Sequence, residues 1–235
     1  METDKVVPKT KPWAKKVLKI VWIGVVSLAS LYFVGRLVWR FSGSNQWEFV
    51  GEKNGVKVYS LKEPGNDLLQ VKGIVRVRSP LANLVKMSQD ATFCKEMGCL
   101  DGRVLDWLDD QVQYVYFRYD LPFPWRSREF VVRTWTYQNP RTKEVLMKVS
   151  AVPDKLPPNP CCFRVTEVNN TIRFTPLGNG QVEVEYVQHL NEGGFMPDLL
   201  LNEARGQLMF TGLPQLQSFV DREKYQNARF DFIKE

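Results

Sequence analysis

The chain has 235 residues, of which 44% are hydrophobic and 12% aromatic, and its formal net charge is +6. This composition excludes a disordered chain, and the length suits one or two folded domains. All of the excess positive charge lies in the first forty residues, which hold eight basic and two acidic side chains. Because the remainder has no surplus of positive charge for binding phosphates, we expect no nucleic-acid partner.

An uncharged apolar run covers residues 20–35. Extended to residues 17–39, it makes a helix of about 34 Å at ~1.5 Å per residue, enough to cross a hydrocarbon core of ~30 Å. A cleaved signal peptide is the alternative, because basic residues precede the run and the small residues near positions 27–29 resemble a cleavage site. We favour an uncleaved anchor, because the run continues well past that site.

The charges around this run predict its orientation. Six lysines precede it and two arginines follow it closely. The positive-inside rule therefore predicts a single-pass membrane protein with a cytoplasmic N-terminus and a domain on the periplasmic, lumenal or extracellular side. We divide the chain into a basic tail (1–16), a transmembrane anchor (17–39), a folded domain (46–222) and a C-terminal tail (223–235).

After residue 47 the dominant pattern has period two, which predicts strands. The expected strands are 55–61, 68–78, 112–119, 130–137, 144–152, 162–169, 171–177 and 181–190, with a turn at Asn54-Gly55. Residues 79–90 predict a helix, with Ser79 as the N-cap and Pro80 as its first residue, and a short helix is expected over 91–97.

A long amphipathic helix is predicted from residue 197 to residue 220. Its expected apolar stripe is Leu201, Ala204, Leu208, Gly212, Leu216 and Phe219. Pro214 should kink it, because its ring displaces a backbone hydrogen bond. Short connections favour antiparallel strands. The predicted fold class is therefore α+β: a curved antiparallel sheet of eight or nine strands wrapped on the long C-terminal helix, preceded by one transmembrane helix.

The sequence offers few candidates for catalysis. His189 is the only histidine, and no serine or cysteine belongs to a recognisable nucleophile motif. The acidic residues Asp106, Asp109 and Asp110 are interpreted as a solvated turn. We therefore expect no catalytic residues, no enzymatic activity and no cofactor.

The four cysteines do not form a metal site. Cys94 and Cys99 lie about 140° apart on a helix at ~100° per residue, and Cys161 and Cys162 should face opposite sides of a strand. Zinc-ligand spacing is absent, so we expect no metal. The spacing of Cys94 and Cys99 allows a disulfide in an oxidising compartment, but we favour simple packing of the two thiols.

Aromatic side chains are expected to line the concave face of the sheet. The residues concerned are Tyr114, Tyr116, Phe117, Trp135, Phe163 and Tyr186. One helix laid across a curved sheet often leaves space beneath it. That space would form an apolar pocket for a hydrophobic ligand.

Four segments, in order, resemble the START domain, the lipid-transfer module related to the steroidogenic acute regulatory protein. They begin at Trp47, Pro122, Arg173 and Asn191, and the resemblance spans residues 46–220. It implies a helix-grip fold that holds a lipid non-covalently under the C-terminal helix. The segment 152–160 corresponds to the lid loop of the family.

The chain departs from the family pattern in three places. Glu129 replaces an aspartate, Glu192 replaces a loop proline, and Thr134 stands where the family has a second arginine. The chain also has no acidic residue where the steroid-binding members of the family place a pocket carboxylate, so a sterol ligand does not follow from the resemblance. Arg128 and Glu129 should point to opposite faces of their strand, one bonded and the other solvated, and we favour a structural role for Arg128 over ligand contact.

The sequence thus predicts a membrane-anchored lipid-binding or lipid-transfer protein, whose partners are a lipid or other hydrophobic small molecule and the bilayer. The alternative is an enzyme with the same superfamily fold, such as a cyclase or a hydrolase. A third possibility is a partner-binding domain with a filled interior. The predicted ligand-binding residues are Tyr114, Tyr116, Arg128, Trp135, Val152, Leu156, Phe195, Met196, Leu200 and Leu208.

Overall fold

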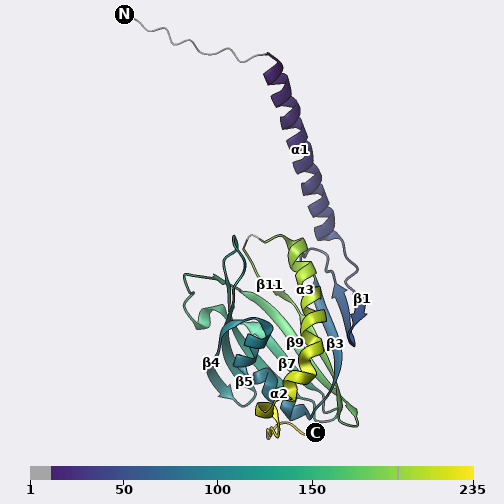
Figure 1. Cartoon of the computed structure of the whole chain (residues 1–235), viewed down its shortest axis with the longest axis vertical. Coiled ribbons are helices and arrows are strands. Elements are labelled where there is room, and N and C mark those ends of the chain that lie inside the picture. The colour runs from purple at the N-terminus through teal and green to yellow at the C-terminus, as the bar shows by residue number, and fades with distance from the viewer. Residues whose placement is uncertain (1–11, 195) are drawn as a thin grey trace, which may run out of the picture.

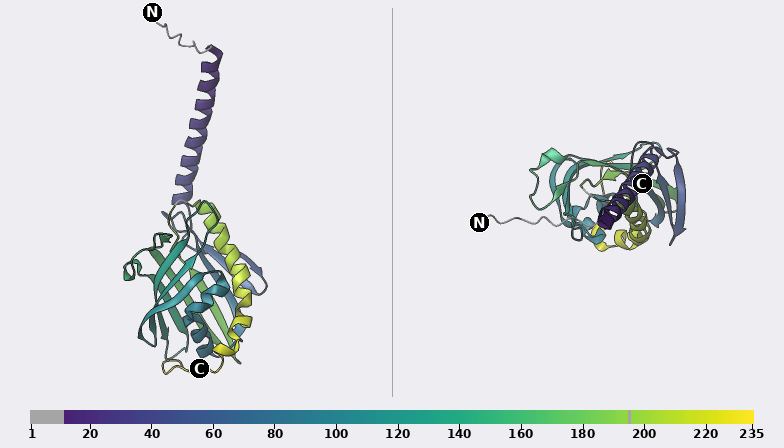
Figure 2. Two further views of the ribbon diagram at one scale, coloured as in Figure 1. Left: turned by 60° about the vertical axis from the view of Figure 1, so that its left-hand side comes forward. Right: turned by 90° about the horizontal axis from the view of Figure 1, so that it is seen from above.

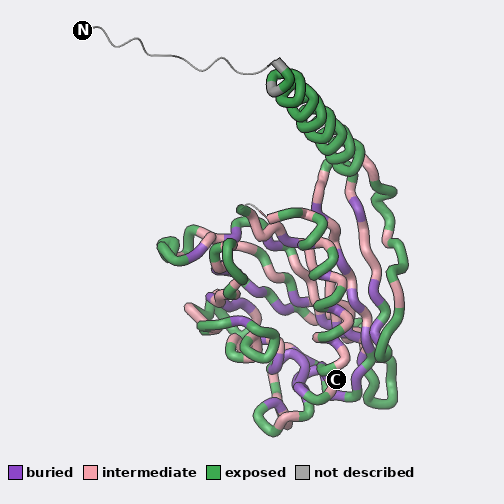
Figure 3. Tube along the Cα trace, turned by 45° about the horizontal axis from the view of Figure 1, so that its top comes forward, coloured by how far each residue is buried: buried purple, intermediate pink, exposed green. Residues whose placement is uncertain are grey.

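The structure, a computed structural model, describes residues 12–194 and 196–235. Helix α1 (Pro12–Phe41) stands out from one end of the folded domain (Figure 1). Lys15–Phe41 is long and apolar enough to cross a membrane, and none of its most apolar window is buried (Figure 3). Most of the predicted basic tail and the predicted ligand residue Phe195 lie outside the described residues.

The domain is built on one sheet of eleven strands, in which every pairing is antiparallel except the parallel pairing of β8 with β6. In space the main strands follow the order β1-β2-β3-β10-β9-β7-β6-β5-β4, with β11 beside β9 and β8 beside β6 (Figure 1). The strands are β1 (Trp47–Lys53), β2 (Val56–Leu61), β3 (Gln70–Arg78), β4 (Leu100–Asp109), β5 (Val112–Tyr119), β6 (Arg128–Gln138), β7 (Val145–Ala151), β8 (Phe163–Arg164), β9 (Glu167–Gly178), β10 (Gln181–Gln188) and β11 (Leu190–Asn191). The predicted fold class is confirmed.

The predicted long helix is also confirmed. It consists of α3 (Asp198–Gly212), a 3₁₀ turn η3 (Leu213–Gln215) and α4 (Leu216–Val220), and it runs along one face of the sheet (Figure 2). Pro214 lies in the 3₁₀ turn, where the missing N–H interrupts the α-helical ladder. The remaining short elements are η2 (Pro153–Lys155) and η4 (Glu223–Tyr225).

Helix α2 (Leu81–Gln89) begins one residue later than predicted, and Ser79 is not its N-cap. The hydroxyl of Ser79 donates instead to the carbonyl of Pro80. The carboxylate of Glu235 accepts the N–H groups of Leu81 and Ala82, at 2.8 and 3.0 Å. The cap is thus supplied by a residue distant in sequence, which a local motif cannot reveal. The next turn, η1 (Ala91–Met97), is a 3₁₀ helix where a short helix was expected.

Strand β4 was missed by the sequence prediction, and the acidic residues assigned to a turn lie in or beside it. Asp106 and Asp109 belong to the strand, and Asp110 follows it. Its register with β5 shifts at three places, so the alternation of polar and apolar residues is interrupted. A strand with such bulges lacks the regular two-residue alternation of polar and apolar side chains, so its sequence does not predict a strand.

Both cysteine pairs form disulfides, Cys94–Cys99 and Cys161–Cys162. The preference for unlinked packing of Cys94 and Cys99 is therefore wrong. The adjacent pair was expected in a strand with its side chains on opposite faces. It precedes β8 instead, in a turn, where the backbone is not extended and the two sulfur atoms can meet.

Two hydrophobic clusters fill the interior. The larger joins β2, β3 and β10 to α2 and to the second half of the long helix, including Met209 and Leu213. The smaller lies near the other end of the sheet and is formed by Val115, Phe130, Val132, Val165, Val168 and Leu190. None of the buried members of this second cluster comes from α3. The N-terminal half of α3 therefore contributes no buried side chain to this second cluster.

Candidate functional site

Helix α3 identifies the inner face of the sheet. Gly73 of β3 packs so closely against α3 and η3 that a Cβ atom there would lie 2.3 Å from Cδ1 of Leu213 in η3 and 3.1 Å from the sulfur of Met209 in α3. Strand pairing connects Gly73 through Tyr186, Ile172 and Met147 to Thr136. Since side chains alternate along a strand, the odd positions of β3, β5 and β7 and the even positions of β6, β9 and β10 share this inner face.

Three predicted ligand residues lie on the opposite, outer face. Tyr114, Tyr116 and Trp135 occupy even positions of β5 and an odd position of β6. The Lys155 ammonium lies 4.2 Å from the ring centroid of Tyr114, and Trp135 stacks on Tyr137. The expectation that these aromatics line the concave face is wrong, because it was based on residue type and did not follow the alternation of faces.

The inner face has its own aromatic group. Phe117 stacks on Phe130 with ring centroids 4.7 Å apart, and Tyr119 meets both rings edge-on. Tyr186 lies further along the face, and its hydroxyl accepts a hydrogen bond from the Asn170 amide at 3.3 Å. Burial raises the pKa of Tyr119, and burial together with the nearby Tyr119 raises the pKa of Tyr186. Both phenols therefore stay neutral at ordinary pH.

Several of these inner side chains are only half-buried, although helix α3 covers the face (Figure 3). They are Phe117, Tyr119, Val149, Ala151, Asn170, Ile172 and Tyr186. Side chains in a filled core at such positions would be inaccessible. The inner face therefore presents an accessible, mainly apolar surface.

The side of α3 that is turned toward η1 is apolar and exposed. Leu200, Ala204, Leu208 and Gly212 are spaced by four and form one stripe. Gly212 approaches Met97 of η1, so the stripe faces the space between α3 and η1. Leu200 and Leu208 are 53% and 54% exposed. Both were predicted to bind ligand, and that role stays a prediction.

The apolar stripe predicted for the long helix (α3, η3 and α4) is partly wrong. Leu201, Leu216 and Phe219 are buried as expected, but Ala204 and Leu208 are exposed. The buried positions between Leu201 and Leu216 are instead taken by Arg205, Met209 and Leu213. The prediction considered only hydrophobic residues, so it did not include Arg205, which is buried in the middle of the face of α3 that packs on the domain.

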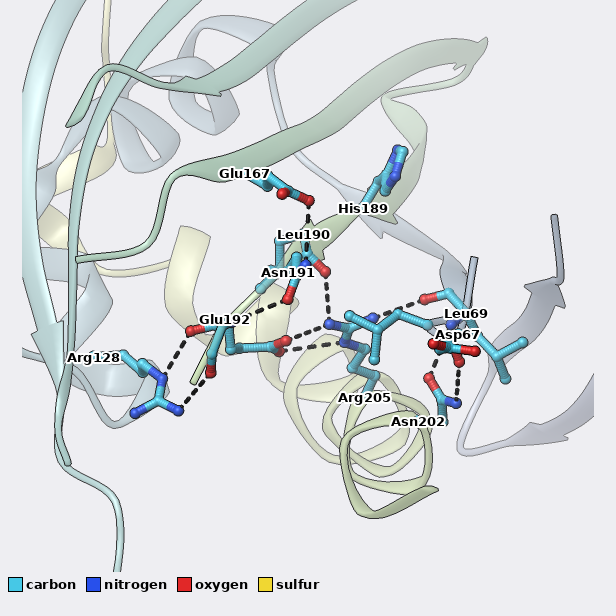
Figure 4. A network of polar contacts seen from close by, with 12 residues as sticks. Asp67, Leu69, Arg128, Glu167, His189, Leu190, Asn191, Glu192, Asn202 and Arg205 are labelled. Carbon is cyan, nitrogen blue, oxygen red and sulfur yellow. Dashed lines mark hydrogen bonds and ion pairs between the residues drawn. The ribbon is translucent and has the colours of Figure 1, made fainter. Parts of the chain in front are cut away.

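That arginine is the centre of a polar network (Figure 4). The Arg205 guanidinium forms an ion pair with the Glu192 carboxylate and donates to the carbonyls of Leu69 and Leu190, at 2.9 and 2.6 Å. Asn202, one turn earlier, accepts a hydrogen bond from the Leu69 N–H at 2.9 Å. Glu192, which departs from the family pattern, is thus the counter-ion of a buried cation.

Arg128 holds the same loop from the other side. Its guanidinium donates to the carbonyls of Glu192 and Gly193, at 2.8 and 2.7 Å, and to that of Arg126 (Figure 4). Arg128 is 3% exposed, and burial lowers its pKa. This contact set fits the favoured structural role, in which Arg128 orders a loop, whereas contact of Arg128 with a ligand stays an untested prediction.

Glu129 does not stay solvated, contrary to expectation. It is fully buried on the outer face, where Arg164, the Asn159 N–H and the Tyr116 hydroxyl donate to its carboxylate. The nearest of these contacts is 2.9 Å. Both members of the Arg-Glu pair are therefore buried and paired, each on its own face of β6.

The segment 152–160, expected to be a lid, is held on the outer-face side. Arg164 donates to the carbonyl of Leu156 at 2.9 Å, and Lys155 forms an ion pair with Asp106 of β4 at 3.1 Å. The N–H of Val152 donates to the carbonyl of Val131 at 2.8 Å. Val152 and Leu156 therefore lie beside the buried Glu129 site, and their role in ligand binding stays a prediction.

One end of the domain lies next to α1, and we call it the mouth; its segments are 62–69, 120–127 and 189–194 (Figures 1 and 2). Arg36 of α1 forms ion pairs with Asp198 of α3 at 3.3 Å and with Asp67 at 3.6 Å. The indole N–H of Trp39 donates to the carbonyl of Asp67 at 3.0 Å. The buried Lys62 ammonium donates to carbonyls at the end of α1 and within the mouth. Helix α1 and the mouth are thus joined by ion pairs and hydrogen bonds.

Other features of the domain do not suggest chemistry. A largely polar groove of about 410 Å³ lies between β1–β3 and η3, away from the predicted ligand residues. His189 lies between β10 and β11, beside Glu167 and Asn169. Within residues 12–194 and 196–235, no group of three or more His, Cys, Asp or Glu side chains is arranged to hold a metal.

Comparisons with known proteins agree with this architecture. A family model described as the START domain matches residues 42–225. An uncharacterised protein of Pseudomonas aeruginosa is 24% identical over 161 residues, which cover 68% of this chain and 79% of that protein.

Two solved structures are similar over most of the folded domain. A STAR-related lipid transfer protein fragment from Xanthomonas axonopodis is 25% identical, with a TM-score of 0.69, over 75% of this chain and 99% of that one. The lipid transfer and protein localization domain of human StarD13 is 16% identical, with a TM-score of 0.66, over 75% of this chain and 90% of that one. The same sheet and C-terminal helix therefore occur in both.

Proposed function

The chain belongs to the START domain family, and we propose that it is a membrane-anchored protein that holds one lipid between the inner face and α3 and exchanges it with the adjoining bilayer. The name of the Xanthomonas relative, a lipid transfer protein, supports lipid binding or transfer as the general function. The observation that carries the proposal is the accessible apolar inner face opposite the stripe of Leu200, Ala204 and Leu208. Such a surface suits an acyl chain or another apolar body.

The position of α1 supports exchange at the mouth. Two hydrophobic side chains near this end are unusually exposed: Phe123 in the β5–β6 loop at 96% and Leu199 at the start of α3 at 79%. If α1 spans the membrane, the β5–β6 loop and the start of α3, which carry these side chains, lie at the end of the domain next to the bilayer (Figure 2). A lipid would then pass between the membrane and the inner face without crossing bulk water.

We further propose the layout in which residues 17–39 are the anchor and 46–222 form the lipid-binding domain outside the cytoplasm. The lysine-rich N-terminal side supports a cytoplasmic N-terminus. The two disulfides support an oxidising compartment for the domain, since disulfides persist in the periplasm, the endoplasmic reticulum lumen and the extracellular space. A reporter fused after Glu235 should be active only on that side, and carbonate washing should not extract the protein. Cytoplasmic reporter activity, or a processed N-terminus at Ser30, would contradict this topology.

We assign no catalytic step to the site. At the inner-face positions of β3, β5, β6, β7, β9 and β10, the only charged residue is Arg128, and its N–H groups already hold backbone carbonyls. A surface of this kind can bind and release a lipid but supplies no acid–base pair.

Filling the space opposite the inner face tests lipid binding. Ala204→Trp should remove co-purifying lipid from the full chain, because the indole would occupy the space between α3 and the inner face. Gln207→Trp is the matched control, since residue 207 is exposed and lies on the solvent side of the same helix. Mass spectrometry of extracted lipids gives the readout. Equal lipid content in wild type and Ala204→Trp, with the fold retained, would place the ligand elsewhere or argue against one.

A further inference from the structure

A band of neutral polar side chains crosses the inner face. Gln113 of β5 pairs with Thr134 of β6, which pairs with Val149 of β7, which pairs with Asn170 of β9. Gln188 of β10 follows Val187, the partner of Thr171, so it falls opposite Asn170. Apolar rows lie on either side of the band, apart from Thr136 and Tyr186 in the row below. The polar groups are therefore gathered at one level of an otherwise apolar surface.

Four side-chain oxygens in this band and the row beside it have no partner, whereas the Asn170 side chain donates to the Tyr186 hydroxyl and accepts from the His189 N–H. Among the described residues, the side-chain oxygens of Gln113, Thr134, Thr136 and Gln188 are buried and accept or donate no hydrogen bond. Gln113, Thr134 and Thr136 are 1%, 6% and 0% exposed. The Gln113 amide nitrogen is already fixed by the carbonyl of Gln89 at 3.0 Å, so its oxygen is free for another group. Unpaired buried polar atoms are costly, and a cluster of them on one surface indicates a missing partner.

The side chains of the band are uncharged, and the two buried arginines of the inner-face side, Arg205 and Arg128, are already engaged. Arg205, the buried cation of α3, is neutralised by Glu192, and Arg128 lies at the mouth end of β6 with its N–H groups occupied. A phosphate or carboxylate drawn to this level would lose its hydration without gaining a counter-ion. A hydroxyl, an ester or an amide would lose much less and could bond to the unpaired oxygens.

From these observations, and resting on the lipid-binding function proposed above, we propose that the unpaired oxygens of the band and of Thr136 in the neighbouring row bind uncharged polar groups of the ligand, and that the ligand is a neutral lipid. Val149 and Asn170 in the same row are half-buried, so a lipid lying on the inner face contacts this row beside the buried oxygens. Its apolar body then contacts Phe117, Ile172 and the stripe on α3.

A competition experiment tests the lipid class. The full chain in detergent is incubated with equal amounts of dioleoylglycerol, cholesterol, dioleoylphosphatidylcholine and oleate, re-purified and extracted. We expect the neutral lipids to be recovered at least tenfold over the phospholipid and the anion. Preferential recovery of dioleoylphosphatidylcholine or oleate would overturn the neutral-lipid proposal and leave lipid binding intact. Recovery of none of the four would count against the proposed function as well.

A pair of substitutions tests the band itself. Thr134→Val with Thr136→Val removes two unpaired hydroxyls at almost constant shape. Binding of the preferred neutral lipid should weaken roughly tenfold or more, since two hydrogen bonds are lost. The midpoint of thermal unfolding without lipid should stay equal or rise, because two unsatisfied groups leave the interior. Thr171→Val, on the outer face of β9, is the control and should change neither quantity.

This pair of readouts separates a binding role from a structural one. Unchanged lipid affinity in the double variant would show that the band is not the polar subsite. A lower unfolding midpoint would show that the two hydroxyls serve the fold, and would equally overturn the proposal.

Discussion

Replacing Glu192 by glutamine should destabilise the folded domain by about 3–5 kcal/mol, because a buried cation would lose its counter-ion. Arg205 is 2% exposed, and its other N–H groups are used by the carbonyls of Leu69 and Leu190, so it cannot turn to water. For a domain of this size each kcal/mol shifts the unfolding midpoint by ~2–4 °C, which gives a fall of roughly 6–20 °C. Urea unfolding of the full chain in detergent, followed by near-ultraviolet circular dichroism, measures the free energy.

Glu203→Gln is the matched control. Glu203 lies on the exposed side of α3, where it accepts a hydrogen bond from Gln207, and its replacement should change the stability by less than about 0.5 kcal/mol. The double variant Glu192→Leu with Arg205→Met should recover much of the loss, because neither charge then remains buried alone. A cost below about 1 kcal/mol for Glu192→Gln would refute the view that this carboxylate neutralises Arg205.

Three further predictions concern acid stability, helix capping and the cysteines. Burial by itself raises the pKa of Asp90, but hydrogen bonds, first among them that from Lys224, lower it from 3.8 to about 2. This carboxylate therefore stabilises the fold above the unfolded pKa near 3.8, and the contribution is lost as the pH falls through about 2. Asp90→Asn should flatten the pH dependence of unfolding in that range, and an unchanged slope would contradict the assignment. Glu235→Ala should cost about 1 kcal/mol through loss of the cap on α2, measured by urea unfolding, and an unaltered midpoint would argue against the cap. The four cysteines should give no thiol reaction in the denatured, unreduced chain and four thiols after reduction, whereas any reactive thiol before reduction would disprove a disulfide.

The sequence alone was sufficient for the architecture. The apolar run before residue 40 appears as one exposed helix, α1, and most strands were found from period-two alternation. The long C-terminal helix and its break at Pro214 also followed from local rules. These features were predictable because hydrophobic periodicity and the proline ring act within a few residues of each other.

Local patterns failed where the chain departs from regular alternation. Strand β4 was missed because three register shifts interrupt its period. The N-cap of α2 was assigned to Ser79, whereas the carboxylate that caps it comes from Glu235, far away in the sequence. A residue type can suggest a cap, but only the folded chain decides which carboxylate reaches the helix end.

The candidate site depended most on tertiary structure. Tyr114, Tyr116 and Trp135 were chosen as aromatics, yet strand pairing puts them on the outer face. Phe117 and Tyr186 occupy the inner face as expected, together with Tyr119, which was not predicted. The sequence shows that side chains alternate but not which parity faces α3, because that choice is made by a contact between distant residues such as Gly73 and Leu213. The sequence also does not reveal the pairing of the buried charges or the unpaired atoms of the polar band. Their residues come from separate elements, and only the assembled domain decides which of them find a partner.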